Sequence, residues 1–187
     1  MRATKGFSLI ELMVTVTVLA LLLAAAVPNF REYLTNNKVR TVAGEMRDGL
    51  QHARMEAIRH NESVTFCMGT GSATGTGWEV HLGSDCTGTS LRRRPTSSSE
   101  ASHVTLSPTS LTVTFNGSGR RASVAPGTTL TTLDVSWSGT CGDDCVAMRV
   151  EVSAGGMIRS CSQNVSSGPQ ACTAAASTSS SSGGPTS

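Results

Sequence analysis

The feature that most constrains this chain is an apolar run near its start, Phe7–Val27, which carries one charged residue, Glu11. At about 1.5 Å per residue, a helix over this run would be roughly 30 Å long, enough to cross the hydrocarbon core of a bilayer. Arg2 and Lys5 precede the run, and basic flanking residues tend to stay on the cytoplasmic side. The pattern predicts a single-pass membrane helix over residues 7–30 with a cytoplasmic N-terminus.

A cleaved secretory signal peptide is the alternative for the same run. A signal peptide has a basic start, an apolar core and small residues at the cleavage site, and LLLAAAVP offers such residues. The run is long for a signal peptide and carries Glu11 near its start. The strong small-residue break before the run is Gly6, and cleavage there would leave the apolar helix on the mature protein.

Glu11 needs a physical reason to lie in an apolar helix, because an ionised side chain inside a bilayer costs on the order of 3 kcal/mol unless it is paired. The sequence has no basic residue between Phe7 and Phe30, so a partner must come from another molecule. Such a pair would set the axial register of packed helices, since a slip leaves two unpaired charges. The alternative is that Glu11 lies at the headgroup interface near the cytoplasmic end.

The cysteines all lie beyond the apolar run. Their even number in a small Ser-, Thr- and Gly-rich region predicts disulfides in an oxidising compartment. Many pairings are open, and spacing favours Cys67–Cys86, Cys141–Cys145 and Cys161–Cys172. A zinc site is the competing interpretation, but CGDDC lacks the CxxC spacing and no HxxxH partner follows it.

The rest of the chain predicts an α+β fold. Over residues 31–61 the apolar positions follow helical spacing and form one stripe: Val39, Val42, Ala43, Met46, Leu50, Ala53 and Ala57. Gly44 and Gly49 each weaken this helix by about 1 kcal/mol relative to alanine, so packing must hold it. Seven β-rich runs follow: ESVTFCM, GWEVHL, HVTLS, LTVTFN, TLDVSW, CVAMRVEVS and MIRSCS.

The expected architecture is a long N-terminal helix, with a membrane half and an amphipathic half, packed on an antiparallel β domain over residues 62–173. Two runs, GTGSATGTG and RRRPTSSSEAS, have the composition of loops. Residues 174–187 are low in complexity, which predicts a disordered tail.

The start of the chain, KGFSLIEL, closely resembles the class III signal of type IV prepilins and pseudopilins. The resemblance implies a leader over residues 1–6, cleavage by a prepilin peptidase between Gly6 and Phe7, and methylation of the new Phe7 amine. It also implies that Glu11 pairs with the N-terminal amine of a neighbouring subunit. Pro28 matches a proline common near the end of the membrane helix in that family.

The second half is similar to the GspH/FimT family of minor pilins and pseudopilins. The resemblance rests on three phrases in order: ARMEAIRHNESVTFC, LTVTFNGSGRRA and MRVEVSAGGMIRSC. It implies a pilin-like, non-catalytic subunit of the bacterial inner membrane whose globular domain lies in the periplasm or outside the cell. Its partners would be other pilins or pseudopilins in a type IV pilus or type II secretion pseudopilus, where it would help to initiate or cap the filament.

DNA capture during natural transformation is the alternative function. Arginine side chains can bind phosphates, and the candidates are Arg92, Arg93, Arg94, Arg120, Arg121 and Arg159. FimT proteins that bind DNA carry a GRxR phrase near the C-terminus, whereas this chain reads Gly156-Met157-Ile158-Arg159 and lacks the first arginine. Without Arg2 and Lys5 the basic and acidic residues are equal in number, and Asp134, Asp143 and Asp144 are candidates to offset the arginines.

An enzymatic or metal-binding function has little support in the sequence, so we expect no catalytic residue, cofactor, metal or small-molecule substrate. His52, Glu56 and His60 share a helix face, but their spacing is not HExxH and an exposed polar face explains it. Asp143 and Asp144 have too few oxygen ligands nearby to predict a calcium site.

Overall fold

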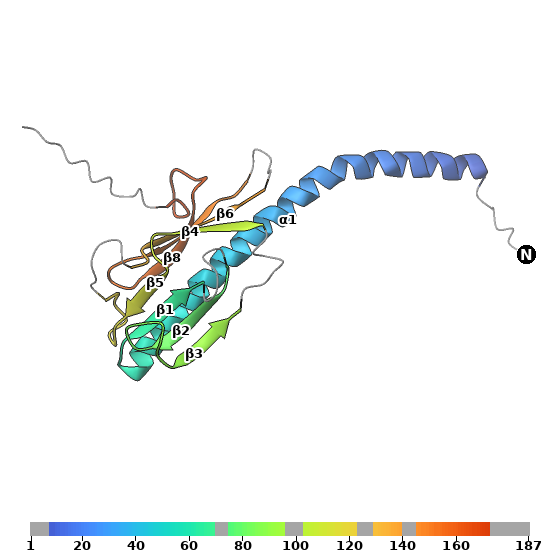
Figure 1. Cartoon of the computed structure of the whole chain (residues 1–187). Helices are drawn as coiled ribbons and strands as arrows, with labels where there is room; N and C mark the ends of the chain where they lie inside the picture. Colours follow the sequence, from blue (N-terminus) through green and yellow to red (C-terminus); the bar gives the residue numbers. More distant parts are fainter. Residues whose placement is uncertain (1–7, 70–74, 96–102, 123–128, 140–144, 173–187) are drawn as a thin grey trace, which may run out of the picture.

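The computed structural model describes residues 8–69, 75–95, 103–122, 129–139 and 145–172, without the side chains of residues 25–29. One long helix, α1 (Leu9–His60), projects from a β domain that packs on its C-terminal half (Figure 1). The strands are β1 (Val64–Met68), β2 (Trp78–Leu82), β3 (Ser90–Arg94), β4 (Val104–Pro108), β5 (Thr112–Phe115), β6 (Thr132–Trp137), β7 (Met148–Val152) and β8 (Ile158–Ser162). The α+β class predicted from the sequence is confirmed.

Local side chains determine where α1 begins and ends. Ser8 is the N-cap, and its hydroxyl accepts a hydrogen bond from the Glu11 amide at 3.3 Å. Such a cap satisfies one of the free amide groups of the first turn. Asn61 is the C-cap with a left-handed φ of 52°, and its amide donates to the carbonyls of Ala57 and Ile58. Asparagine tolerates this conformation better than most residues.

The predicted apolar stripe of α1 is buried against the β domain. All of its members, from Val39 to Ala57, are at most 1% exposed. They pack with Phe66, Trp78 and the other inward-facing residues of the strands in one core. The helix is therefore held by tertiary packing, as its two glycines require.

Two four-stranded antiparallel sheets form the domain, in the orders β3-β2-β1-β5 and β4-β6-β7-β8. The second sheet lies nearer the projecting part of α1, and the first lies nearer its C-terminal end (Figure 1). Contacts between α1 and the strands agree with this arrangement of the two sheets along the helix. Lys38 Nζ lies 5.7 Å from the Trp137 ring centroid in β6, whereas Gly49 packs against Trp78 in β2.

The prediction that Arg92, Arg93 and Arg94 lie in a loop was wrong, because they belong to strand β3. The strand pairs with β2, with Arg93 opposite Glu79 and Arg94 opposite Trp78. Arginines do not give the apolar alternation that predicts a strand. The segment is a strand because its backbone pairs with β2. Charged residues on an edge strand also discourage pairing with another chain.

Two of the disulfides favoured by spacing are present, Cys67–Cys86 and Cys161–Cys172. Their Cα atoms are 6.1 Å and 4.9 Å apart. Cys145 is also disulfide-bonded, and its predicted partner, Cys141, lies outside the described residues. Each bridge over a loop of this size stabilises a domain by on the order of 3 kcal/mol.

The N-terminal half of α1 projects away from the β domain (Figure 1). Its large apolar side chains are exposed, from 74% for Leu9 down to 51% for Val18. The described residues contain no helix that is both long and apolar enough to cross a membrane, so the span expected over residues 7–30 is not confirmed. The leader at residues 1–6 and the tail at 174–187 lie outside the described residues.

Two glycines of α1 give a matched test of the packing. A Cβ on Gly49 would lie 2.7 Å from Trp78 Cε2 and 2.9 Å from Phe66 Cε2, whereas a Cβ on Gly44 would meet nothing within 4 Å. We expect Gly49→Ala to lower the free energy of unfolding by about 1–2 kcal/mol, because overpacking outweighs the gain in helix propensity. Gly44→Ala should raise it by up to about 1 kcal/mol. Denaturant unfolding of the full chain in detergent measures both, and equal effects would contradict the packing.

Candidate functional site

Three segments far apart in the sequence meet at one point, which we call the three-segment junction: Arg54 in α1, Gly119 after β5 and Gly156 in the β7–β8 turn. Arg54 Nε donates to the Gly119 carbonyl at 3.0 Å. A Cβ on Gly156 would lie 1.9 Å from that same carbonyl oxygen. The turn and the loop are therefore in direct backbone contact. Each segment belongs to one of the three phrases that carried the family resemblance.

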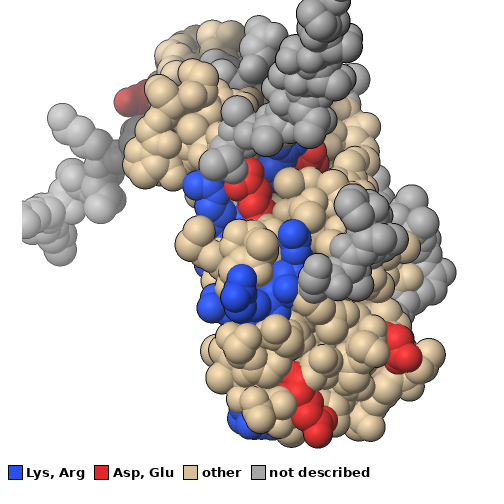
Figure 2. All heavy atoms as spheres, turned by 90° about the vertical axis from the view of Figure 1, so that its left-hand side faces the viewer, with Lys and Arg blue, Asp and Glu red and all other residues tan. Residues whose placement is uncertain are grey.

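Three candidate arginines belong to the segments of the junction: Arg120 and Arg121 directly follow Gly119, and Arg159 lies in β8 after Gly156. The Arg120 side chain is exposed, and its backbone amide donates to Asn116 Oδ1 at 3.0 Å. Arg121 Nη1 donates to the Val152 carbonyl at 3.1 Å. Seen from the side of β5 and β8, the basic side chains gather near the middle of the molecule (Figure 2).

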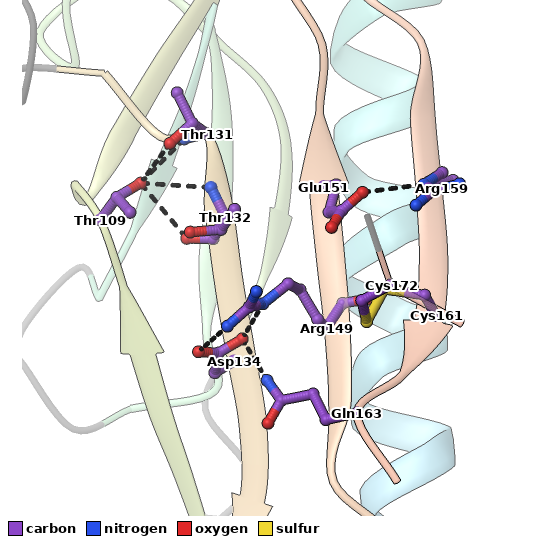
Figure 3. Close-up of polar contacts among 10 residues, drawn as sticks. All are labelled: Thr109, Thr131, Thr132, Asp134, Arg149, Glu151, Arg159, Cys161, Gln163 and Cys172. Carbon is purple, nitrogen blue, oxygen red and sulfur yellow. Dashed lines mark hydrogen bonds and ion pairs between the residues drawn. A yellow bond between two sulfur atoms is a disulfide. The ribbon is translucent and has the colours of Figure 1, made fainter. Parts of the chain in front are cut away.

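One carboxylate lies close to this group. Arg159 Nε donates to Glu151 Oε2 at 2.8 Å across the β7–β8 hairpin (Figure 3). Glu151 and Arg159 are directly opposite in the register of the two strands. Part of the positive charge predicted for DNA binding is thus neutralised within the protein, and the exposed Arg120 is the better placed side chain for an external anion.

Asp134 does not pair with any of the candidate arginines. It binds Arg149 through both carboxylate oxygens, at 2.6 Å and 2.9 Å (Figure 3). These hydrogen bonds raise the pKa of Arg149. No pattern in the sequence indicates this pair, because only the antiparallel β6–β7 register places the two residues opposite each other. It stabilises the outer face of the second sheet.

The arginines of β3 form a separate group at the other edge of the first sheet. Arg93 Nε donates to Glu79 Oε1 at 2.9 Å, and Arg94 pairs with Glu45 of α1. Among the described residues Arg92 makes no ion pair, but it lies near His52. Burial of the ring, followed by the charge of Arg92, lowers the pKa of His52. Since β3 and β5 are opposite edges of the sheet, the two arginine groups do not form one surface.

The family profile for the type II transport protein GspH matches residues 42–156, which is more than half of the chain. The chain belongs to the GspH family. A second profile, the prokaryotic N-terminal methylation motif, matches residues 1–27. The GspH match contains Arg54, Gly119 and Gly156 of the three-segment junction, whereas Arg159 lies beyond it.

Known relatives of this GspH-family protein include pilins. A type IV major alpha-pilin of Moraxella bovis is 39% identical over 49 residues, covering 26% of this chain and 31% of the relative. A fimbrial protein of Pseudomonas aeruginosa is 34% identical over 64 residues, covering 34% of this chain and 41% of the relative. The chain thus spans less than half the length of these curated relatives.

Among solved structures, the type IV minor pilin FimU of Pseudomonas aeruginosa aligns with this chain. It aligns with a TM-score of 0.47 and 19% identity, over 66% of this chain and 87% of FimU. A second crystal form of FimU gives a TM-score of 0.45.

Glu11 of the GspH-family protein lies on the exposed, apolar half of α1. Its side chain is exposed and its amide is bound by the Ser8 cap. No ion pair of Glu11 occurs within the part of the chain that the structure describes. Gly6 and Phe7, the predicted cleavage and methylation residues, lie outside that part.

The helix histidines lie on either side of Glu56, which also pairs with Arg59. Glu56 Oε2 lies 3.0 Å from Arg59 Nε and 3.4 Å from His60 Nε2, while Glu56 Oε1 lies 3.9 Å from His52 Nε2. In the described ranges, one group of three potential ligand atoms lies within 4.8 Å: Glu151, Cys161 and Cys172. Both of its sulfurs belong to a disulfide, so they cannot bind a metal. Asp143 and Asp144 lie outside the described ranges.

Proposed function

We propose that this GspH-family protein is a non-catalytic minor pilin or pseudopilin that assembles through its N-terminal helix into a type IV pilus or type II secretion pseudopilus. The observation that carries the proposal is the unpartnered apolar half of α1, where the large side chains are at least half exposed. A helix that exposes apolar side chains all round is stable only in lipid or among other helices. A filament built from packed helices provides the second environment, and the inner membrane provides the first before assembly.

Processing at the N-terminus would prepare the helix for assembly. A prepilin peptidase would cut between Gly6 and Phe7 and methylate the Phe7 amine. The match of residues 1–27 to the N-terminal methylation motif supports this step. Glu11 would then pair with the Phe7 amine of a neighbouring subunit and set the register between helices.

The β domain would supply the lateral contacts of the subunit. It would lie in the periplasm or outside the cell, where the disulfides Cys67–Cys86 and Cys161–Cys172 persist. In this position a subunit of low abundance helps to initiate or cap the filament.

Deletion of the gene tests this proposal if it is scored in parallel for surface pili, uptake of labelled DNA and secretion of exoproteins. We expect loss of pili with intact secretion for a type IV pilus subunit, and loss of secretion alone for a pseudopilus subunit. Normal pili, uptake and secretion would contradict a role in either filament.

DNA binding is the second candidate function, and the arginines at the three-segment junction favour it. Arg54, Arg120, Arg121 and Arg159 belong to the three segments that meet at this junction. Several are already bound to protein groups, which lowers the number of phosphates that they can contact. Loss of DNA uptake with normal pili would support this candidate.

A mobility-shift assay with double-stranded DNA tests the second candidate directly. If the junction binds DNA, Arg120→Ala should weaken binding at physiological salt. The slope of log K against log salt concentration should become less negative by about 0.9 for each phosphate that the protein no longer neutralises. Arg92→Ala on the separate β3 edge is the matched control and should leave binding unchanged. Absence of a mobility shift with the wild-type protein would contradict DNA binding as a function.

A further inference from the structure

A cleft of about 440 Å³ lies between α1 and the edge of the second sheet. Arg40 contributes from the helix, Val146 and Met148 from the region of β7, and Ser160 and Ser162 from β8. The side chains of Ser160 and Ser162 point to the helix side of the sheet, since they lie opposite Val150 and Met148. Hydroxyls thus occupy positions where an apolar side chain would have closed the gap between helix and sheet.

Strand β8 is the last strand of its sheet, and the described residues pair with its outer edge at Ser162. Gln163 N–H donates to Ala147 O at 2.9 Å toward β7, whereas Ser162 N–H donates to Gln170 O at 2.8 Å on the other side. Because backbone groups alternate between the two sides of an antiparallel strand, the N–H and C=O of Ser160 point to the outer side, like those of Ser162. The segment at Gln170 and Ala171 covers the edge at Ser162, and Cys172 is tied to Cys161 by a disulfide.

Arg40 is the one charged residue among the described residues that line the cleft. It is exposed and makes no ion pair with any described residue. A guanidinium beside two hydroxyls is complementary to a carboxylate, which it can bind by charge-assisted hydrogen bonds. The adjacent backbone groups of Ser160 are complementary to the backbone of an extended chain.

We propose that this cleft binds an extended, acidic segment of a neighbouring pilin-like subunit. The backbone of the segment pairs with Ser160 at the outer edge of β8, and its carboxylate binds Arg40. Arg40 follows Val39, the first buried residue of the α1 stripe, so the cleft lies where α1 leaves the domain. The contact would therefore continue the helix packing between subunits. This inference rests on the proposed function.

Site-specific photo-crosslinking in intact cells tests the contact. The full chain carries p-benzoylphenylalanine at Ser160, and a matched control carries it at Thr105, which is exposed on the edge strand β4. Mass spectrometry of the product should identify a non-helical segment with an acidic residue from a pilin-like subunit, and only for the Ser160 variant. Crosslinks solely to this chain, to lipid, to a helical segment or to an unrelated protein, or no crosslink at all, would overturn the inference.

Charge reversal provides a second measurement that does not depend on the bulky probe at Ser160. Arg40→Glu should reduce the amount of this subunit in purified filaments at least tenfold, whereas Arg40→Lys should keep most of it. Arg40 is exposed, so neither change should alter the unfolding midpoint. Normal amounts of the Arg40→Glu variant in filaments would contradict the cleft contact, but they would not contradict the proposed pilin function. Absence of the wild-type protein from filaments would instead count against the function itself.

Discussion

Gly156→Ala is expected to lower the free energy of unfolding by about 3–5 kcal/mol, since it combines backbone strain with a steric clash in the buried junction. Gly156 has a φ of +79°, and a Cβ there would lie 1.9 Å from the Gly119 carbonyl oxygen. The carbonyl cannot move freely, because it also accepts the hydrogen bond of Arg54. Denaturant unfolding of the full chain in detergent, with the disulfides intact, measures the decrease.

The neighbouring residue gives the control for this change. A Cβ on Gly155 would meet only Ser153 Oγ, at 3.8 Å, so Gly155→Ala should change the unfolding free energy by no more than about 0.5 kcal/mol. Equal stabilities of the two variants would show that the backbone contact between Gly156 and Gly119 does not hold the domain together.

Glu11→Leu is expected to reduce incorporation of the subunit into filaments at least tenfold. If Glu11 pairs with the Phe7 amine of a neighbouring subunit as proposed, its removal leaves that charge uncompensated, which costs about 3–5 kcal/mol. The leucine also makes the helix more apolar, so the subunit should still reach the membrane fraction at its normal level. Quantitative immunoblots of sheared filaments and of membranes separate the two quantities.

Thr15→Leu is the matched control for Glu11→Leu. The Thr15 hydroxyl donates to the Leu12 carbonyl of its own helix, so its replacement leaves no charge unpaired, and incorporation should stay near the wild-type level. Normal incorporation of Glu11→Leu would favour the alternative that Glu11 lies at the headgroup interface. A decrease for both variants would mean that helix polarity, not pairing, determines assembly.

Elements with a strong period were predictable from the sequence alone. The apolar stripe from Val39 to Ala57 repeats at helical spacing, and every member is buried. The β-rich runs with alternating residues became strands. The two short-range disulfides could also be favoured, because cysteines close in sequence meet readily when short strands and loops separate them.

The roles of the arginines could not be read from the sequence. Six candidates were equivalent by residue type, yet Arg93, Arg94 and Arg159 bind carboxylates of the protein itself. Those partners come from other strands or from the helix, so only the pairing register decides which arginine is neutralised. For the same reason residues 92–94 of β3 were expected to lie in a loop, since nothing in these residues indicates the pairing with β2.

Local residue patterns are enough to specify the long helix, its buried stripe, the antiparallel β domain and the pilin-like start of the chain. These features depend on spacing and on side-chain polarity, which are properties of neighbouring residues. The three-segment junction, the division of the arginines into two groups and the cleft beside Arg40 arise only when the chain is folded. Each of these depends on backbone contacts between segments far apart in the chain, such as that of Gly119 with Gly156, and no local pattern encodes them.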